Sequence, residues 1–336
     1  MHRDGGDSVP TAHRKEPQMS VSHRQQAWSV SSFPGKSREI RQVLFSLIVL
    51  ALLPLSAHGQ TAADRAFATE VATASTAVVA ALAKVRAADK NGNIGFYTGG
   101  WCTFGAFLRS GQSISMTTQL DKGKGYVFVA AGDDNASDVD VEVQSESGIR
   151  LASDTDSDKA AVAGLIAERS GEHRVKTTMY RAKGESFCVL IMLEVGQKSL
   201  PAEALAQCMA KWVTGSAALH AASQKNDGTA LTLKHGDRDW VFFGAALEDG
   251  DSVTFSGMSP GRGRAVLYAC GDENATDIDA AAKDSDGDTI AEDEDDDPTP
   301  IVQWSTSAGE TYKVSVTLIS TKATRSFVVA SVFKRK

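Results

Sequence analysis

An internal repeat with a spacing of about 139 residues constrains the fold more than any other feature of the sequence. Residues 132–140 read GDDNASDVD, and residues 271–279 read GDENATDID. Trp101 and Trp240 match at the same spacing. A period this long is typical of duplicated domains rather than of a solenoid. We therefore expect one folding unit to occur twice in the chain.

The repeat divides the chain into three segments. Residues 1–59 form a leader, residues 60–198 hold the first repeat and residues 199–336 hold the second. No long flexible linker separates the two repeats, so they have the opportunity to pack together. The sequence leaves open whether they do so and which oligomeric state the chain adopts.

Each repeat is predicted to open with a helix. Apolar residues recur at helical spacing in both copies, and alanine, the best helix former, fills many other positions of the first helix. Pro201 suits the first turn of the second helix. The apolar stripes are interpreted as faces that pack against the following strands; they comprise Phe67, Val71, Val78, Leu82 and Val85, and then Leu205, Cys208, Met209 and Trp212.

Short strands follow each helix. Residues 138–143, DVDVEV, alternate strictly, which predicts valines facing a core and carboxylates facing solvent. Residues 126–131 and 265–269 read as buried strands, and glycine- and aspartate-rich turns recur between the strands. The pattern predicts a mainly β chain with two tandem antiparallel β-sandwiches, each preceded by an α-helix.

The leader has the three-part layout of a secretory signal peptide. Lys36, Arg38 and Arg41 precede an apolar run over residues 43–55, and small residues allow cleavage near Gly59. We expect a periplasmic or extracellular protein that is free of the membrane after cleavage; an uncleaved N-terminal anchor is the alternative. The remaining chain has 28 basic and 38 acidic residues, a net charge of −10. This charge argues against nucleic acid and anionic membranes as partners, and it suits divalent cations.

Four cysteines raise the question of disulfides. An even number of cysteines in an exported chain favours disulfide pairing, and three pairings are open. We favour Cys102–Cys188, because both fall in the first and last strands of the first repeat. Cys208 and Cys270 would then remain in the second repeat. Buried free thiols are the alternative.

The strands of each repeat resemble the bacterial pre-peptidase C-terminal domain. The resemblance lies in short motifs, which are YVF at 126–128, GDD at 132–134, DVDV at 138–141, GE at 171–172 and GETYKV at 309–314. It implies a jelly-roll-like β-sandwich that serves as a non-catalytic accessory module of exported proteins and sometimes binds calcium. Such domains usually follow a secreted peptidase, whereas no peptidase is recognisable here.

Clustered carboxylates are the candidate metal ligands. Calcium takes six to eight oxygen ligands, which carboxylates and loop carbonyls can supply. The alternative is that these residues are solvated turns and outward strand faces. The candidate ligands are Asp133, Asp134, Asp138, Asp140, Asp154 and Asp156 in the first repeat, and Asp272, Glu273, Asp277, Asp279, Asp293 and Asp295 in the second.

Catalytic motifs are weak in this sequence. Ser259 lies in a GMSPG segment, which matches the pattern of a hydrolase nucleophile elbow. That elbow requires a helix after the serine, whereas the sequence predicts a strand there. No HExxH motif occurs, and His173, His220 and His235 are interpreted as surface or turn residues. Trp101 and Trp240 either anchor a helix to each sandwich or, if exposed, stack on a carbohydrate ring.

We therefore expect a non-catalytic exported binding or accessory protein. Its partner would be an extracellular or periplasmic protein or a polysaccharide, with Ca²⁺ as the candidate cofactor. One alternative is a docking subunit of a separate secreted enzyme. Another is a hydrolase with an unrecognised carboxylate site.

Overall fold

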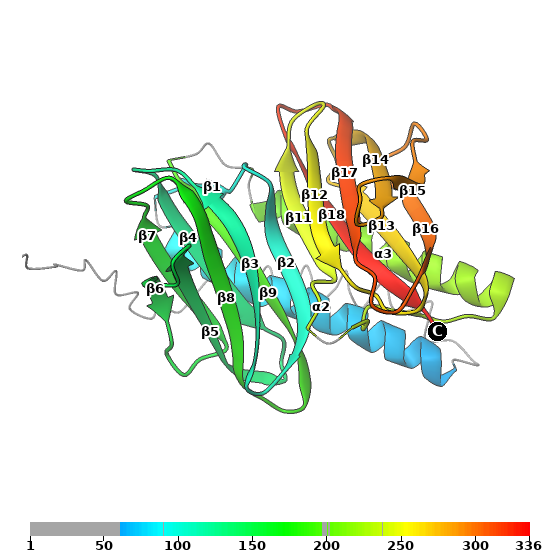
Figure 1. The fold of residues 1–336 in the computed structure, drawn as a ribbon, viewed down its shortest axis with the longest axis horizontal. Helices are drawn as coiled ribbons and strands as arrows, with labels where there is room; N and C mark the ends of the chain where they lie inside the picture. Colours follow the sequence, from blue (N-terminus) through cyan, green and yellow to red (C-terminus); the bar gives the residue numbers. More distant parts are fainter. Residues whose placement is uncertain (1–60, 90, 197–199, 201, 237) are drawn as a thin grey trace, which may run out of the picture. The chain divides into compact units, whose positions relative to one another are not determined.

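A computed structural model describes residues 61–336 except residues 90, 197–199, 201 and 237. The predicted leader, its signal peptide and Pro201 lie outside the described residues. The described chain is mainly β, with antiparallel sheets and two long helices (Figure 1).

The elements of the two halves follow the same order. The first half comprises α2 (Ala62–Ala88), β1 (Ile94–Phe96), β2 (Trp101–Arg109), β3 (Gln112–Leu120), β4 (Gly125–Gly132), β5 (Ala136–Ser145), β6 (Arg150–Asp154), β7 (Ala160–Ile166), β8 (Gly171–Ala182) and β9 (Glu185–Val195). The second comprises α3 (Ala202–Asp227), β10 (Leu231–Thr232), β11 (Phe242–Leu247), β12 (Ser252–Met258), β13 (Gly263–Gly271), β14 (Ala275–Lys283), β15 (Thr289–Asp293), β16 (Ile301–Thr306), β17 (Tyr312–Thr321) and β18 (Ser326–Arg335).

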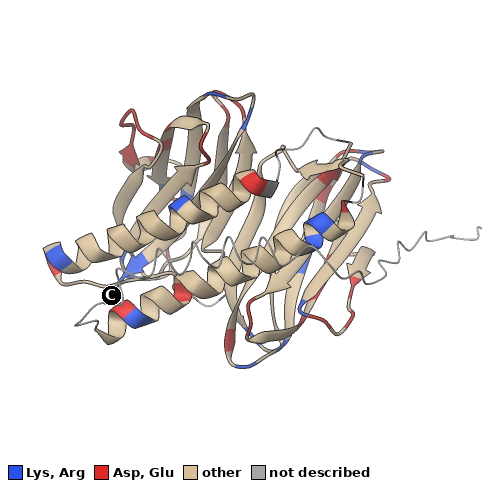
Figure 2. Cartoon of the chain, turned by 180° about the vertical axis from the view of Figure 1, so that it is seen from behind, with Lys and Arg blue, Asp and Glu red and all other residues tan. Residues whose placement is uncertain are grey.

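Three sheets organise these strands. One ten-stranded sheet runs through both repeats, with the order β16-β13-β18-β11-β2-β9-β4-β7, and β1 and β10 join β9 and β18. Two four-stranded sheets, β3-β8-β5-β6 and β12-β17-β14-β15, pack against it, one in each repeat. The helices contact β4 and β9, and β13 and β18, of the long sheet. Figure 2 shows both helices lying across the same face of that sheet.

The apolar stripes predicted for the helices are confirmed. Phe67, Val71 and Val78 are each 1% exposed, and Trp212 of α3 is fully buried. Thr61 begins α2 in a capping box with Asp64, which satisfies two backbone N–H groups at the helix start. By length and composition α2 could also cross a membrane, but half of its most apolar stretch is buried inside the protein.

The first helix crosses from one repeat to the other. Its N-terminal part packs on the second repeat, where the Phe67 ring stacks on His220 of α3 with centroids 4.2 Å apart. The Glu70 carboxylate accepts hydrogen bonds from the Leu233 N–H at 2.7 Å and from the Thr232 hydroxyl. Its C-terminal part packs on β4 and β9 of the first repeat. The sequence predicts the buried face of this helix but not that two repeats share it.

Equivalent strands of the two repeats pair with each other at the junction. In the antiparallel pair of β2 and β11, Phe104 lies opposite its own equivalent, Phe243. Trp101 packs on Phe243 and Trp240 packs on Phe104, with centroids 5.4 and 5.5 Å apart. These contacts repeat as a twofold axis would require. The two tryptophans therefore hold the repeats together, and at 6% and 5% exposure they are not available for stacking on a sugar.

Two glycines in the junction strands make room for a phenylalanine ring of their own repeat. A Cβ atom at Gly105 would lie 2.4 Å from the Phe187 ring, and one at Gly244 would lie 2.8 Å from the Phe327 ring. Phe187 and Phe327 occupy equivalent positions in β9 and β18. Each repeat thus uses a glycine to admit a phenylalanine ring against the shared sheet.

The predicted Cys102–Cys188 disulfide is wrong. All four cysteines are free and buried. The register of β2 and β9 places Cys188 opposite Ala106, four residues along the strand from Cys102. At about 3.3 Å per residue this separates the two cysteines by about 13 Å, beyond the reach of a disulfide. Strand membership alone could not reveal this offset.

Candidate functional site

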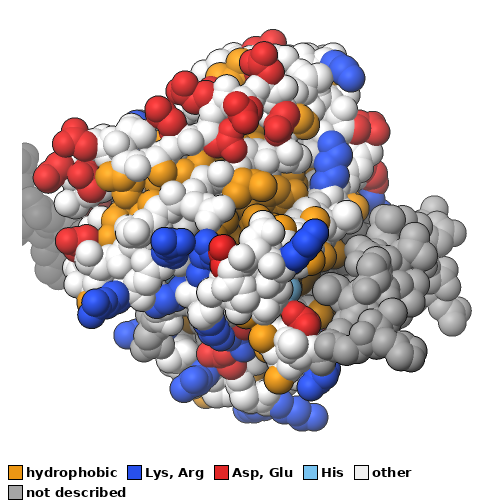
Figure 3. All heavy atoms as spheres, turned by 90° about the vertical axis from the view of Figure 1, so that its right-hand side faces the viewer, with side chains coloured by type: hydrophobic (Ala, Val, Ile, Leu, Met, Phe, Trp, Pro, Cys, Tyr) orange, Lys and Arg blue, Asp and Glu red, His pale blue; other side chains and the backbone are white. Residues whose placement is uncertain are grey.

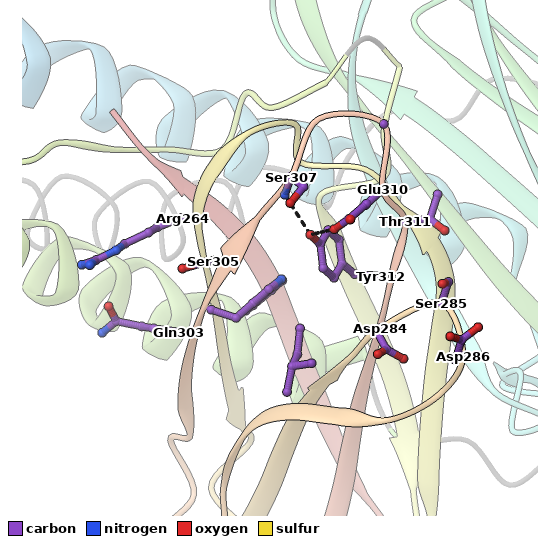
Figure 4. A pocket seen from close by; sticks show the side chains of 13 residues that line it. Arg264, Asp284, Ser285, Asp286, Gln303, Ser305, Ser307, Glu310, Thr311 and Tyr312 are labelled. Atoms are coloured by element: carbon purple, nitrogen blue, oxygen red, sulfur yellow. Dashed lines mark hydrogen bonds between the residues drawn. The ribbon is translucent and has the colours of Figure 1, made fainter.

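An open groove lies at the free side of the second repeat, between the edge strand β16 and the β14–β15 turn (Figure 4). Its volume is about 990 Å³. Polar side chains dominate the lining, which comprises Arg264, Asp284, Ser285, Asp286, Ile290, Gln303, Trp304, Ser305, Ser307, Gly309, Glu310, Thr311 and Tyr312. The acidic residues come from loops, whereas Arg264, Gln303 and Ser305 come from β13 and β16.

Two buried aromatic residues form the floor of the groove. Trp304 and Tyr312 are 5% and 4% exposed, and their ring centroids are 6.2 Å apart. Tyr312 accepts a hydrogen bond from the Ser307 N–H and donates one to Glu310 Oε2, both at 2.9 Å. Burial and the Glu310 carboxylate raise the pKa of Tyr312, so its hydroxyl stays protonated. The Trp304 Nε1–H, which is buried, has no hydrogen-bond partner among the described residues.

The acidic wall is held by a tight turn. Asp284 Oδ1 accepts hydrogen bonds from the N–H groups of Gly287 and Asp288, both at 2.9 Å. Gly287 has φ +101°, a conformation that favours glycine. The internal repeat predicts a strand-connecting turn here, because Asp286 and Gly287 correspond to Ser147 and Gly148 of the first repeat. The structure confirms the turn, which leaves the exposed Asp286 beside the groove. Figure 4 shows Asp284, Ser285 and Asp286 on one side of the groove, and Arg264 and Gln303 on the other.

The aromatic floor belongs to the second repeat only. The strand registers equate Trp304 with Leu165, because these residues lie opposite the equivalent positions Ala265 and Tyr126. They also equate Lys313 with Arg174, which makes Tyr312 the counterpart of His173. Sequence reasoning missed this floor, although a tryptophan without an equivalent in the other repeat was a usable signal.

Asp133 and Asp272 are buried anchors of a turn in both repeats. Asp272 Oδ2 accepts from the Phe327 N–H and its Oδ1 accepts from the Asn274 N–H, both at 2.9 Å. Asp133 likewise accepts from the Phe187 and Asn135 N–H groups. Exposure is 1% at Asp133 and 0% at Asp272. These bonds tie the turn after β4 or β13 to the last strand of the repeat, which gives both residues a structural role.

Other predicted ligands fix the loop after β6 or β15. Asp154 accepts from the N–H groups of Asp156 and Val162. Asp293 does the same for Asp295 and Ile301. Of the remaining candidates, Asp134 forms an exposed ion pair with Lys159 at 3.1 Å, while Asp156, Glu273 and Asp295 lie exposed at turns.

Asp138 and Asp140 in the first repeat, and Asp277 and Asp279 in the second, each form a negatively charged corner. Burial, together with the neighbouring Asp138 and Asp154 carboxylates, raises the pKa of Asp140. Burial and the Asp277 carboxylate do the same for Asp279. Asp138 is only 2% exposed, contrary to the outward position predicted from the alternation, because the bulged start of β5 is covered by the loop at Asp158.

The corners do not form a compact ligand set. Asp138 Oδ1 and Asp277 Oδ1, at equivalent positions, are buried without a hydrogen-bond partner within the described chain. Among all the residues that the structure describes, no three His, Cys, Asp or Glu side chains converge as a metal site requires. Calcium ligation by the predicted residues stays a prediction.

The histidines are buried rather than on the surface. Exposure is 6% at His173, 1% at His220 and 5% at His235. His220 Nε2 lies 3.0 Å from Asp64 Oδ1, and the ring accepts from the Leu231 N–H, so its bonds join α2, α3 and β10. His235 Nε2 donates to Val332 O at 2.9 Å. His173 Nδ1 bonds to the Gly171 carbonyl oxygen within β8, whereas the bonds of His220 and His235 join different elements.

The Ser259 segment connects β12 and β13, as predicted. The Ser259 hydroxyl donates to the Glu310 carbonyl oxygen at 3.2 Å. Because two strands flank the serine, it lacks the strand-to-helix turn of a hydrolase nucleophile.

Comparisons with known proteins find distant structural likenesses only. No protein-family model and no curated protein matches the chain. Among solved structures, the PBSX exported protein XepA matches with 12% identity over 68% of this chain and 84% of that chain, at a TM-score of 0.20. The secreted serine protease VesC from Vibrio cholerae matches with 8% identity over 74% and 52%, at 0.22. The tandem CBM22 domain of Xyn10C from Paenibacillus barcinonensis matches with 11% identity over 67% and 82%, at 0.19.

At these TM-scores the likenesses assign no ligand or activity to this chain. They include β-sandwich and cupin-like domains. The predicted resemblance to the pre-peptidase C-terminal domain is left without a matching family model.

Proposed function

We propose that this chain is a non-catalytic exported binding protein made of two jelly-roll β-sandwiches, with its ligand site in the groove of the second. The strand order supports the jelly-roll assignment. When the eight strands β2–β9 are numbered one to eight, the facing sheets have the orders 1-8-3-6 and 2-7-4-5, and β11–β18 repeat both orders. Two such interleaved four-stranded sheets are typical of a jelly roll.

The observation that carries the proposed binding role is the composition of the groove. Carboxylates, hydroxyls, an amide and a guanidinium surround a buried aromatic floor. Sites for specific ligands combine an apolar base with a few directed polar groups. Arg264 is exposed and has no ion-pair partner among the described residues, so it is available to a ligand.

The proposal of binding without turnover is supported by the surroundings of the candidate reactive groups. Ser259 sits in a strand connection, and the three histidines are buried in packing contacts away from the groove lining. To act in acid–base or nucleophilic catalysis, these groups would have to lie within hydrogen-bond reach of a bound substrate. In the groove itself, Asp284 is bonded to the backbone of its turn and Glu310 to the Tyr312 hydroxyl.

Retention of extracellular material tests the proposal. The immobilised wild-type protein should retain a protein or polysaccharide. Arg264→Ala and Trp304→Leu should each lower the affinity for this material at least about tenfold. Trp304→Leu copies the first repeat. Arg174→Ala, which removes an exposed arginine of the first repeat, is the matched control and should behave as the wild type. Equal retention by all four proteins, or chemical conversion of the retained material, would contradict the proposal.

A docking subunit for a separate exported enzyme is the second candidate function. Ile290 and Ile301, 42% and 40% exposed, flank the groove at the sheet edges. On the face seen in Figure 3, hydrophobic side chains gather in patches that have acidic side chains above them and basic side chains below and beside them. Recovery of one stoichiometric enzyme in the retention experiment would favour this candidate.

Calcium stabilisation is proposed for the negatively charged corners. Burial and the repulsion of neighbouring carboxylates raise the pKa of Asp140 and Asp279, and a cation beside Asp138 and Asp140, and beside Asp277 and Asp279, would offset the repulsion. Millimolar Ca²⁺ should then raise the melting temperature of the wild type more than that of an Asp138→Asn, Asp277→Asn double variant. An equal melting temperature with Ca²⁺ and with chelator would refute it.

A further inference from the structure

We propose that the groove takes an extended basic peptide, which adds as a new strand to the free edge of β16. The inference rests on the proposed binding function and names the class of its ligand. It is carried by the edge of the long sheet, the side chains of β16 and the charge of the groove.

Strand β16 lies at a free edge of the ten-stranded sheet. Residues 301–306 end the ten-stranded sheet and pair with β13 on one side only. Within the described chain, no strand pairs with the other side. At its start, the Ile301 N–H donates to Asp293 Oδ2, which anchors the strand end. An unpaired strand edge is a template for an added strand, because each of its outward N–H and C=O groups can form a main-chain hydrogen bond.

The free edge of β16 lacks the usual protection against the addition of another strand. The sequence IVQWST holds no proline and no charge. Its exposed side chains alternate as Ile301, Gln303 and Ser305, and the pairs with β13 are regular, with no bulge. Proteins normally protect a free edge by charged residues, proline or a bulge. The residues that would discourage strand addition are therefore absent from β16 itself.

Acidic side chains of the groove lie beside this edge. The groove lining includes Asp284, Asp286 and Glu310 against Arg264. The Arg335 guanidinium also donates to Gln303 Oε1 at 3.2 Å, but its charge is paired with Asp227. Asp286 and Glu310 are exposed, so their carboxylates can meet a charged partner. Complementary charge selects partners and sets their orientation. Lysine or arginine side chains on an added strand would pair with these carboxylates, whereas an acidic strand would be repelled.

The first repeat offers an internal contrast. Its equivalent strand β7 ends the same sheet on the other side, but Leu165 and Gly164 replace Trp304 and Gln303. A peptide that recognised sheet edges in general would bind both ends. The groove model predicts one site for each chain, at β16.

Fluorescence anisotropy with labelled peptides tests the proposal on the whole mature chain. The probes are an eight-residue peptide of alternating valine and lysine, its valine–glutamate counterpart, and two valine–lysine peptides N-methylated on alternate residues, one for each strand edge. The lysine peptide should bind with a stoichiometry of one, and at least about tenfold more tightly than the glutamate peptide. One of the N-methylated forms should lose at least about tenfold in affinity, because N-methylation removes the main-chain donors that face β16.

Substitutions then locate the site. Asp286→Asn with Glu310→Gln should weaken the lysine peptide about tenfold, since two charge pairs are lost. The matched control is Glu146→Gln with Glu172→Gln, which removes two exposed carboxylates of the first repeat and should leave affinity unchanged. Equal binding of lysine and glutamate peptides, no effect of either N-methylation, or two sites per chain would overturn the proposal. If the groove retains a polysaccharide but no peptide, the inference fails while the proposed function stands.

Discussion

Removal of the buried Asp272 carboxylate should destabilise the protein strongly, whether or not calcium is present. Two backbone N–H groups donate to this carboxylate at 2.9 Å, one from Phe327 and one from Asn274. A hydrogen bond to a charged group contributes about 1.5–3 kcal/mol, and an unsatisfied buried donor carries a similar cost. Asp272→Ala should therefore lower the free energy of unfolding by about 4 kcal/mol.

The conservative variant refines the magnitude. Asp272→Asn keeps the shape but turns one acceptor oxygen into an NH₂ group that faces a backbone N–H. About half of the loss, on the order of 2 kcal/mol, should remain. Asp133→Ala should cost at least as much as Asp272→Ala, because the third bond to Asp133, from the Ser186 hydroxyl at 2.6 Å, is shorter than the third bond to Asp272, from the Ala275 N–H at 3.3 Å.

Urea unfolding followed by tryptophan fluorescence measures these differences, with the slope of the transition as the check that the unfolded state is unchanged. Glu273→Ala is the matched control, because Glu273 is adjacent but exposed, and it should stay within about 0.5 kcal/mol of the wild type. Each protein is measured with millimolar Ca²⁺ and with chelator. An Asp272→Ala effect under about 1 kcal/mol, or one that appears only with Ca²⁺, would refute the structural role.

Three further predictions concern the junction and the buried histidine. Gly244→Ala should lower the free energy of unfolding, measured by thermal unfolding, by about 2 kcal/mol, because the added Cβ would clash with Phe327. Gly164→Ala should not destabilise the protein, because its Cβ would lie an ordinary 3.7 Å from its nearest neighbour. Phe104→Ala should cost about 3–5 kcal/mol in urea unfolding, since it empties the centre of the junction; a loss under about 1 kcal/mol would contradict that packing. Burial lowers the pKa of His235 to about 4 from 6.5. The unfolded chain therefore takes up this proton first as the pH falls, and stability should drop by about 3 kcal/mol between about pH 6.5 and pH 4. His235→Gln should flatten that slope in pH-dependent urea unfolding, and an unchanged slope would show that another group sets it.

Several features of this protein can be predicted from its sequence because they depend on local periodicity. Alternation in residues 138–143 places three valines in the core, and the structure buries all of them. The helical stripe from Phe67 to Val85 is buried as predicted. The turn before Gly287 follows from the repeat and from the conformational freedom of glycine. Periodicity specifies which face of an element is buried, and that information is contained within the element.

The tertiary structure alone decides which elements meet. No local pattern indicates that Phe104 pairs with Phe243 across the repeats, or that α2 covers both of them, since these contacts join residues far apart in the chain. The same limit explains the cysteine error, because Cys102 and Cys188 share neighbouring strands but not a register.

The candidate site shows the same division. Acidic residues in turns are visible in the sequence, yet burial and backbone hydrogen bonds turn Asp133 and Asp272 into structural anchors. The groove depends on Trp304 and Tyr312, which come from different sheets and meet only when those sheets pack. A sequence specifies the chemistry of each side chain, whereas the packing of distant strands decides which of these chemistries act together.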